Sequence, residues 1–143
     1  MSRRNIFILF LLTLVCFGVG YVLTNNYNFD LCYSNLETNT FDISCHQFYE
    51  KIGDALFYGM GALTLVFLVL LAVPHAFSAW KKFAIWFIPL AVIIFITAPE
   101  PSGWVSPIPA PEQVFQWVSG LYVLVSIAII AIASLRKPHS SQI

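Results

Sequence analysis

Charged side chains are scarce in this sequence: Asp, Glu, Lys and Arg make up only 10% of its 143 residues, whereas hydrophobic residues make up 59%. A soluble domain carries about 25% charged residues, so this composition and a mean hydropathy of +0.79 indicate a chain that is solvated by lipid. The formal net charge is zero. Because no basic excess is present to attract phosphates, we predict no nucleic-acid partner.

Catalytic and cofactor motifs are also missing from the sequence. Its three cysteines form no Cys-x-x-Cys pair, and no histidine pair lies within an apolar stretch to ligate haem. No ionisable residue lies in the middle of an apolar stretch, where proton relays and ion-coupled pumps place theirs. Internal repeats, Gly/Ser linkers and shifts of composition are absent as well. We therefore predict a single membrane domain, residues 1–143, with no catalytic residues and no cofactor.

What the sequence does contain is four apolar stretches, each suited to a helix that crosses the roughly 30 Å hydrocarbon core of a bilayer. We predict spans at about residues 6–23, 52–73, 80–98 and 114–135. The third is the shortest, and it reaches full length only if Trp80, Lys81 and Lys82 form its interfacial end. Pro89 lies in its middle and predicts a kink.

The charges are distributed unevenly between the segments that join these spans. Six of the seven basic residues lie at the N-terminus, in the connection 74–82 or in the tail 136–143, namely Arg3, Arg4, Lys81, Lys82, Arg136 and Lys137. All seven acidic residues lie in or beside the connections 24–51 and 99–113, accompanied only by Lys51. Because segments rich in Lys and Arg stay in the cytoplasm, we predict an all-α, antiparallel four-helix transmembrane bundle with both termini cytoplasmic.

The localisation that follows is the plasma membrane, and the small size and the lack of an Asn-x-Ser/Thr sequon favour a bacterial inner membrane. A cleaved signal peptide is the alternative interpretation of the first span, since Arg3 and Arg4 precede an apolar run that ends in Gly18-Val19-Gly20. The run stays apolar for 18 residues, which is longer than the roughly 7–15 residues of a signal peptide and favours a retained helix. Cleavage would leave three spans and an external N-terminus.

The outer connection 24–51 is long and its pattern predicts local structure. Hydrophobic residues alternate over residues 28–33 and again over 40–45, which indicates two strands of a small hairpin that turns through 34–39. Cys32 and Cys45 fall on the oxidising side of the membrane with twelve residues between them, so we predict a structural disulfide. Closing a loop of this size stabilises the fold by about 3 kcal/mol in the chain-entropy model.

Two kinds of chemistry compete with this structural interpretation of the loop. Four spans with cysteines in an outer loop resemble, in outline, the four-helix quinone-linked thiol oxidases, which use a Cys-x-x-Cys and a second pair for relay. This sequence has neither, so thiol–disulfide exchange at Cys32 and Cys45 is kept as an alternative.

His46, Glu50 and Asp54 are a weak metal-site candidate, because their spacing places them along one helix face. Carboxylates that complement a helix dipole explain the same pattern without a metal, and we favour that explanation.

Small residues mark one face on each of two spans. Ala55 and Gly59 have small-xxx-small spacing, and Ser119, Ser126 and Ala133 have heptad spacing. Such faces let helices approach closely, either within the chain or against another protein. With no catalytic set, we predict a non-enzymatic scaffold or accessory subunit of a membrane complex, whose partners are the lipid bilayer and other membrane proteins. A small transporter or channel component is the further alternative, although the spans supply no polar path.

Overall fold

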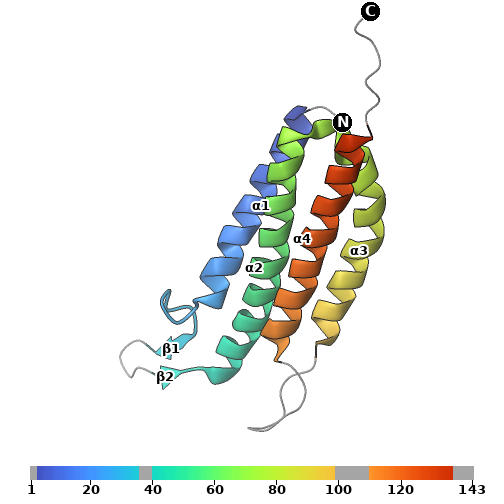
Figure 1. Ribbon diagram of the computed structural model, residues 1–143. Coiled ribbons are helices and arrows are strands. Elements are labelled where there is room, and N and C mark those ends of the chain that lie inside the picture. Colours follow the sequence, from blue (N-terminus) through green and yellow to red (C-terminus); the bar gives the residue numbers. More distant parts are fainter. Residues whose placement is uncertain (1–2, 36–39, 99–109, 137–143) are drawn as a thin grey trace, which may run out of the picture.

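The computed structural model describes residues 3–35, 40–98 and 110–136, which form four long helices and two very short strands (Figure 1). The helices are α1 (Arg3–Thr24), α2 (Ile43–Ala72), α3 (Phe77–Thr97) and α4 (Pro111–Leu135), and the 3-10 turn η1 (Pro74–Ala76) joins α2 to α3. All four helices are long and apolar enough to cross a membrane. The prediction of four helices long and apolar enough to span a membrane is therefore confirmed, while most of the connection 99–113 and of the tail 136–143 lies outside the described residues.

The second helix begins at Ile43, well before its apolar stretch. Asp42 adopts extended backbone angles and caps the helix, since its carboxylate accepts hydrogen bonds from the backbone N–H groups of Ser44 at 2.9 Å and Cys45 at 3.2 Å. Such a cap stabilises a helix start by about 1 kcal/mol. The prediction of a strand through residues 40–45 is therefore wrong at its C-terminal end, because the cap outweighs the alternating pattern.

The hairpin exists, but it is smaller than predicted. Strands β1 (Tyr33–Asn35) and β2 (Thr40–Phe41) pair antiparallel, with Tyr33 opposite Phe41. Residues 25–31 form turns instead of the predicted first strand, since the N–H of Leu31 donates to the carbonyl of Asn26 at 3.2 Å. Part of the predicted turn, residues 36–39, lies outside the described residues.

The helices lie side by side as a row in the order α1, α2, α4, α3 (Figure 1). The contact between α1 and α2 is the closest: a Cβ added to Gly20 would lie 2.6 Å from the backbone nitrogen of Phe57, and one added to Gly53 would collide with the backbone of Thr24. Gly20 precedes Thr24 in α1, whereas its neighbour Phe57 follows Gly53 in α2. These two helices therefore run in opposite directions where they touch. Among the described residues, the backbones of α2 and α3 come close at few positions, and these two helices meet through side chains such as Phe67 and Trp80.

A hydrophobic core joins α2, η1, α3 and α4 near the η1 turn, and Trp80 is central to it. Its ring packs edge-on against Phe67 with centroids 5.3 Å apart, and its indole N–H donates to the hydroxyl of Ser126 at 3.3 Å. The side chain is only 4% exposed. Trp80 was predicted to lie at a membrane interface, but the structure buries it between helices because its N–H finds a protein acceptor there.

Candidate functional site

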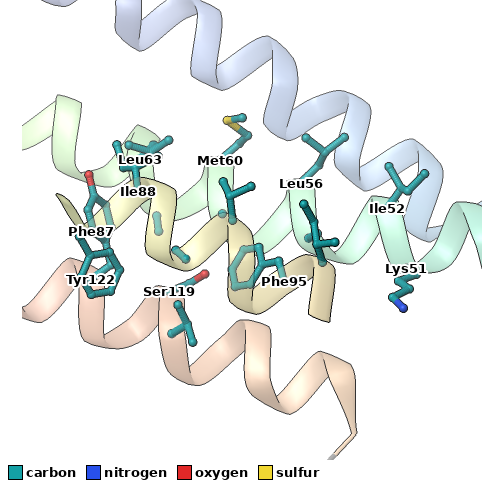
Figure 2. Close-up of a pocket in the computed structure, with 17 residues that line it drawn as sticks. Lys51, Ile52, Leu56, Met60, Leu63, Phe87, Ile88, Phe95, Ser119 and Tyr122 are labelled. Carbon is teal, nitrogen blue, oxygen red and sulfur yellow. The ribbon is translucent and has the colours of Figure 1, made fainter. Parts of the chain in front are cut away.

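The most prominent hollow in the described part of the chain is an apolar groove between α2 and α3, closed at its floor by α4 (Figure 2). Its volume is about 470 Å³, within the roughly 300–1,000 Å³ of small-molecule sites. The walls are aliphatic and aromatic, with Leu56, Met60 and Leu63 from α2 and Phe87, Ile88 and Phe95 from α3. We define these walls and their floor as the groove.

Aromatic side chains set the spacing that keeps the groove open. Phe95 of α3 packs edge-on against Phe115 of α4 with centroids 4.7 Å apart, and Phe83 and Phe87 both contact the ring of Tyr122. These contacts fasten α3 to α4 and not to α2. The groove is therefore the space that remains between two helices which both pack on α4.

The five residues predicted for helix packing occupy three different environments. Ala55, Gly59 and Ser119 line the groove, and a Cβ added to Gly59 would meet the ring of Phe95 at 3.3 Å. Ser126 is fully buried, and Ala133 packs against the core. The small-residue pattern thus contains three positions that shape a cavity, a role that small-residue spacing does not predict.

One hydroxyl group at the floor of the groove, that of Ser119, has no hydrogen-bond partner within the described residues. Ser119 is only 8% exposed, whereas the hydroxyl of Tyr122 at the same floor faces Trp80 and Ser126 in the core. In Figure 2 the Ser119 oxygen points from α4 into the space between the helices. The hydroxyls of Thr64 and Ser134, by contrast, donate to backbone carbonyls of their own helices at 2.7 and 2.8 Å. A buried hydroxyl without a partner costs about 1–3 kcal/mol, so the groove presents unmet hydrogen-bonding capacity.

A second, polar hollow of about 330 Å³ adjoins the outer end of the groove. We call it the acidic rim, since three carboxylates and one ammonium line it: Glu50, Lys51, Asp54 and Glu112. Lys51 lines both the rim and the groove, so the two hollows are adjacent to each other. With three negative charges and one positive charge, the rim is an electrostatically negative mouth to an apolar cavity.

Hydrogen bonds hold the carboxylates of the acidic rim in position. The amide of Gln116 donates to the carboxylate of Glu112 at 3.1 Å and to the hydroxyl of Tyr58 at 2.9 Å, and that hydroxyl donates to Glu112 at 3.0 Å. The hydroxyl of Thr24 donates to the carboxylate of Asp54 at 3.0 Å. The rim is therefore built by α1, α2 and α4 together, and nothing in the local sequence pattern predicts these pairs.

The weak metal-site candidate is only partly brought together. The His46 Nε2 atom lies 3.5 Å from the carboxylate of Glu50, while its Nδ1 atom is 2.5 Å from the side-chain oxygen of Asn26. Asp54 bonds to Thr24 instead. Among the described residues, no group of three or more His, Cys, Asp or Glu is placed to hold a metal ion. The imidazole serves as a structural link between the turn at Asn26 and α2, a contact between residues twenty positions apart that sequence spacing does not reveal.

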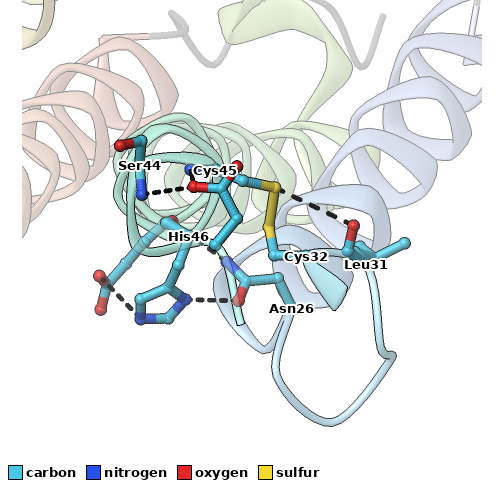
Figure 3. The surroundings of a disulfide bond; sticks show 8 residues. Asn26, Leu31, Cys32, Ser44, Cys45 and His46 are labelled. Atoms are coloured by element: carbon cyan, nitrogen blue, oxygen red, sulfur yellow. Dashed lines mark hydrogen bonds and ion pairs between the residues drawn. A yellow bond between two sulfur atoms is a disulfide. The ribbon is translucent and has the colours of Figure 1, made fainter. Parts of the chain in front are cut away.

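The predicted disulfide between Cys32 and Cys45 is present and links the segment before β1 to the first turn of α2 (Figure 3). Their Cα atoms are 5.7 Å apart, and Cys32 is only 3% exposed. Cys16 is a free thiol in α1. Together with the bonds of Asn26, which is fully buried and donates to the backbone carbonyl of His46 at 3.3 Å, the disulfide fixes the outer cap to the helices.

Comparison with protein-family models, curated proteins and solved structures finds no match for this chain. Its function is therefore inferred from the groove, the acidic rim and the disulfide-linked cap.

Proposed function

We propose that this protein is a multi-pass plasma membrane protein, of a bacterial inner membrane, that acts without catalysis as a scaffold or accessory subunit by binding another membrane component in its groove. The observation that carries this proposal is the open groove itself. The helices form a row in which the backbones of α2 and α3 come close at few positions, so two apolar walls face a cavity that a further molecule would complete.

The arrangement of the helices supports an antiparallel bundle with both ends on one side. In Figure 1 the start of α1, the α2–α3 junction and the end of α4 lie at one end of the row, and the strands lie at the other. The first end carries five basic residues, Arg3, Arg4, Lys81, Lys82 and Arg136. By the positive-inside bias, that end faces the cytoplasm and the disulfide-linked cap faces outward.

The disulfide supports a structural role more than redox turnover. Cys32 is buried and Cys45 is half-buried, so an incoming thiolate has access to one sulfur at most, and the sequence has no second cysteine pair to pass electrons onward. The apolar walls of the groove likewise give ions no polar path, which weighs against a transporter or channel component. Binding without covalent change is the role that remains.

Site-specific photo-crosslinking tests the proposal in native membranes. A photoreactive amino acid at Met60 reports on the groove, and the same group at Leu12, which is 59% exposed on α1, reports on bulk membrane. We expect Met60 to give a discrete adduct that Leu12 does not give. Identical adduct patterns at the two positions would show that the groove holds no specific component and would refute the proposed function.

A further inference from the structure

We propose that the occupant of the groove is a single aminophospholipid of the phosphatidylethanolamine type, held with one of its two acyl chains between α2 and α3 and its ammonium group in the acidic rim. This inference rests on the proposed function, since it uses the same groove, and it goes further by naming the chemical class of the bound component. Three features carry it: the width of the groove, the unpartnered hydroxyl of Ser119 and the charge of the rim.

The size of the groove favours a lipid chain over a helix of another protein. From Glu112 at the rim to Tyr122, α4 extends about 15 Å, ten residues at about 1.5 Å each. The groove is narrow along this length, since a Cβ added to Gly59 on one wall would meet the ring of Phe95 on the other at 3.3 Å. A helix about 10 Å in diameter therefore does not enter between the walls, whereas a single acyl chain is thin enough to lie along them.

The unpartnered hydroxyl of Ser119 favours a ligand that carries a hydrogen-bond acceptor at a defined depth. Ser119 is more than nine-tenths buried and lines the groove without a partner among the described residues. A pure hydrocarbon would leave this hydroxyl unsatisfied. An ester carbonyl oxygen accepts such a bond, and Ser119 lies about 10 Å inward from Glu112 along α4, seven residues at about 1.5 Å each, which leaves room for a phosphate and a glycerol unit.

The charge of the rim selects the headgroup. Three carboxylates surround the mouth of the groove with one ammonium, Lys51, at the point where the two hollows meet. A lipid with net negative charge would be repelled by the carboxylates of Glu50, Asp54 and Glu112. A zwitterionic headgroup meets both signs: its phosphate lies beside Lys51, and its primary ammonium donates hydrogen bonds to the carboxylates.

Native mass spectrometry of the purified full-length protein tests this inference with three defined lipids: phosphatidylethanolamine, phosphatidylcholine and phosphatidylglycerol. We expect one phosphatidylethanolamine to be retained per chain, at least fivefold more than either other lipid. Ser119→Ala removes one neutral hydrogen bond and should lower that retention about fivefold. The double variant Asp54→Asn, Glu112→Gln keeps the hydrogen-bond acceptors for Thr24, Tyr58 and Gln116, and it should abolish the preference over phosphatidylglycerol.

A matched pair of glycine variants separates groove filling from general damage. Gly59→Leu places a side chain against Phe95 inside the groove and should eliminate lipid retention, whereas Gly120→Leu, on a face with no atom within 4 Å, should retain the lipid like the unaltered protein. Circular dichroism of both variants shows whether the helices are intact. Should Gly59→Leu unfold, Ser119→Ala and the double variant still decide the question.

The outcomes distinguish this inference from the proposed function. Equal retention of the three lipids, or a preference unaffected by the double variant, overturns the aminophospholipid assignment. A protein adduct from the photoreactive group at Met60 in native membranes, without retained lipid, also overturns it but leaves the scaffold role standing. The absence of any adduct specific to Met60 overturns both.

Discussion

Two glycines in α1, only two positions apart, should respond oppositely to the same substitution. A Cβ added to Gly20 would lie 2.6 Å from the backbone nitrogen of Phe57 and 3.0 Å from the Leu56 carbonyl carbon, and real Cβ atoms do not approach backbone so closely. Backbone atoms of α2 cannot rotate away as a side chain can. Gly20→Ala therefore forces α1 and α2 apart, whereas Gly18, with nothing within 4 Å, has room for a methyl group.

The two free-energy changes have different signs. Inserting a methyl group into a tightly packed contact costs about 1–3 kcal/mol, and replacing glycine by alanine within a helix returns about 0.5–1 kcal/mol. For Gly20→Ala the net destabilisation is therefore between about 0 and about 2.5 kcal/mol, and contact with backbone atoms favours the upper part of this range. For Gly18→Ala only the helix term applies, so the protein should be stabilised by about 0.5–1 kcal/mol. In a chain of 143 residues, 1 kcal/mol corresponds to a shift in Tm of about 2–8 °C.

Thermal unfolding in one detergent, followed by circular dichroism, measures the difference. We expect the Tm of Gly20→Ala below that of the unaltered protein and the Tm of Gly18→Ala equal to it or above it. Gly120→Ala on α4 is a second control, since it also faces open space. Equal shifts of the same sign for Gly18→Ala and Gly20→Ala would refute the close packing of α1 on α2, and with it the row of helices that leaves the groove open.

Three further predictions concern the cap, the topology and the core. Alkylation of the unreduced protein followed by mass mapping should find Cys32 linked to Cys45 and Cys16 free. Replacing both linked cysteines by serine should lower the free energy of unfolding by about 3 kcal/mol. Free thiols at Cys32 and Cys45 in protein isolated without reductant would contradict the structural role. A reporter fused after Lys137 should behave as cytoplasmic, and one inserted beside Thr38 should not; an external C-terminus would refute the four-span topology. Ser126→Leu, at a fully buried position that accepts a hydrogen bond from Trp80, should destabilise the protein by about 1–3 kcal/mol in the same unfolding assay, while Ser134→Leu at a half-buried position should cost less.

The helices could be predicted from the sequence because a bilayer imposes a simple requirement on length and polarity. Twenty consecutive apolar residues suffice to identify a span, but hydropathy does not mark where a helix begins. Residues 43–51, which precede the apolar run, belong to α2 because the Asp42 carboxylate caps its first turn. Asp is a preferred residue at a helix N-cap, so Asp42 was a local signal for that start, but the alternating pattern of 40–45 favoured a strand.

The candidate site could not be predicted in the same way, because its contacts join residues far apart in the chain. The spacing of Ala55 and Gly59 indicated a small-residue face but not which neighbour it would meet. The bonds between Thr24 and Asp54 and between Tyr58 and Glu112 depend on the order of the helices in the row. That order has no signature in the composition or periodicity of any single helix.

The open groove follows from the way in which small and aromatic residues are divided between the helices. Gly20 and Gly53 bring α1 so close to α2 that α1 is committed to one side of the row and is not available to cover the other. The rings of Phe83 and Phe87 fasten α3 to Tyr122 of α4, so α3 does not collapse onto α2. If α2 and α3 closed the groove by packing on each other, one of these two contacts would break. Little would be gained in return, because lipid is as apolar as the helix surfaces and burying those surfaces against each other supplies no hydrophobic driving force. A bound lipid would fill the groove and give the Ser119 hydroxyl an acceptor without disturbing either contact. We therefore expect the row to be stable while its cavity is completed from outside the chain.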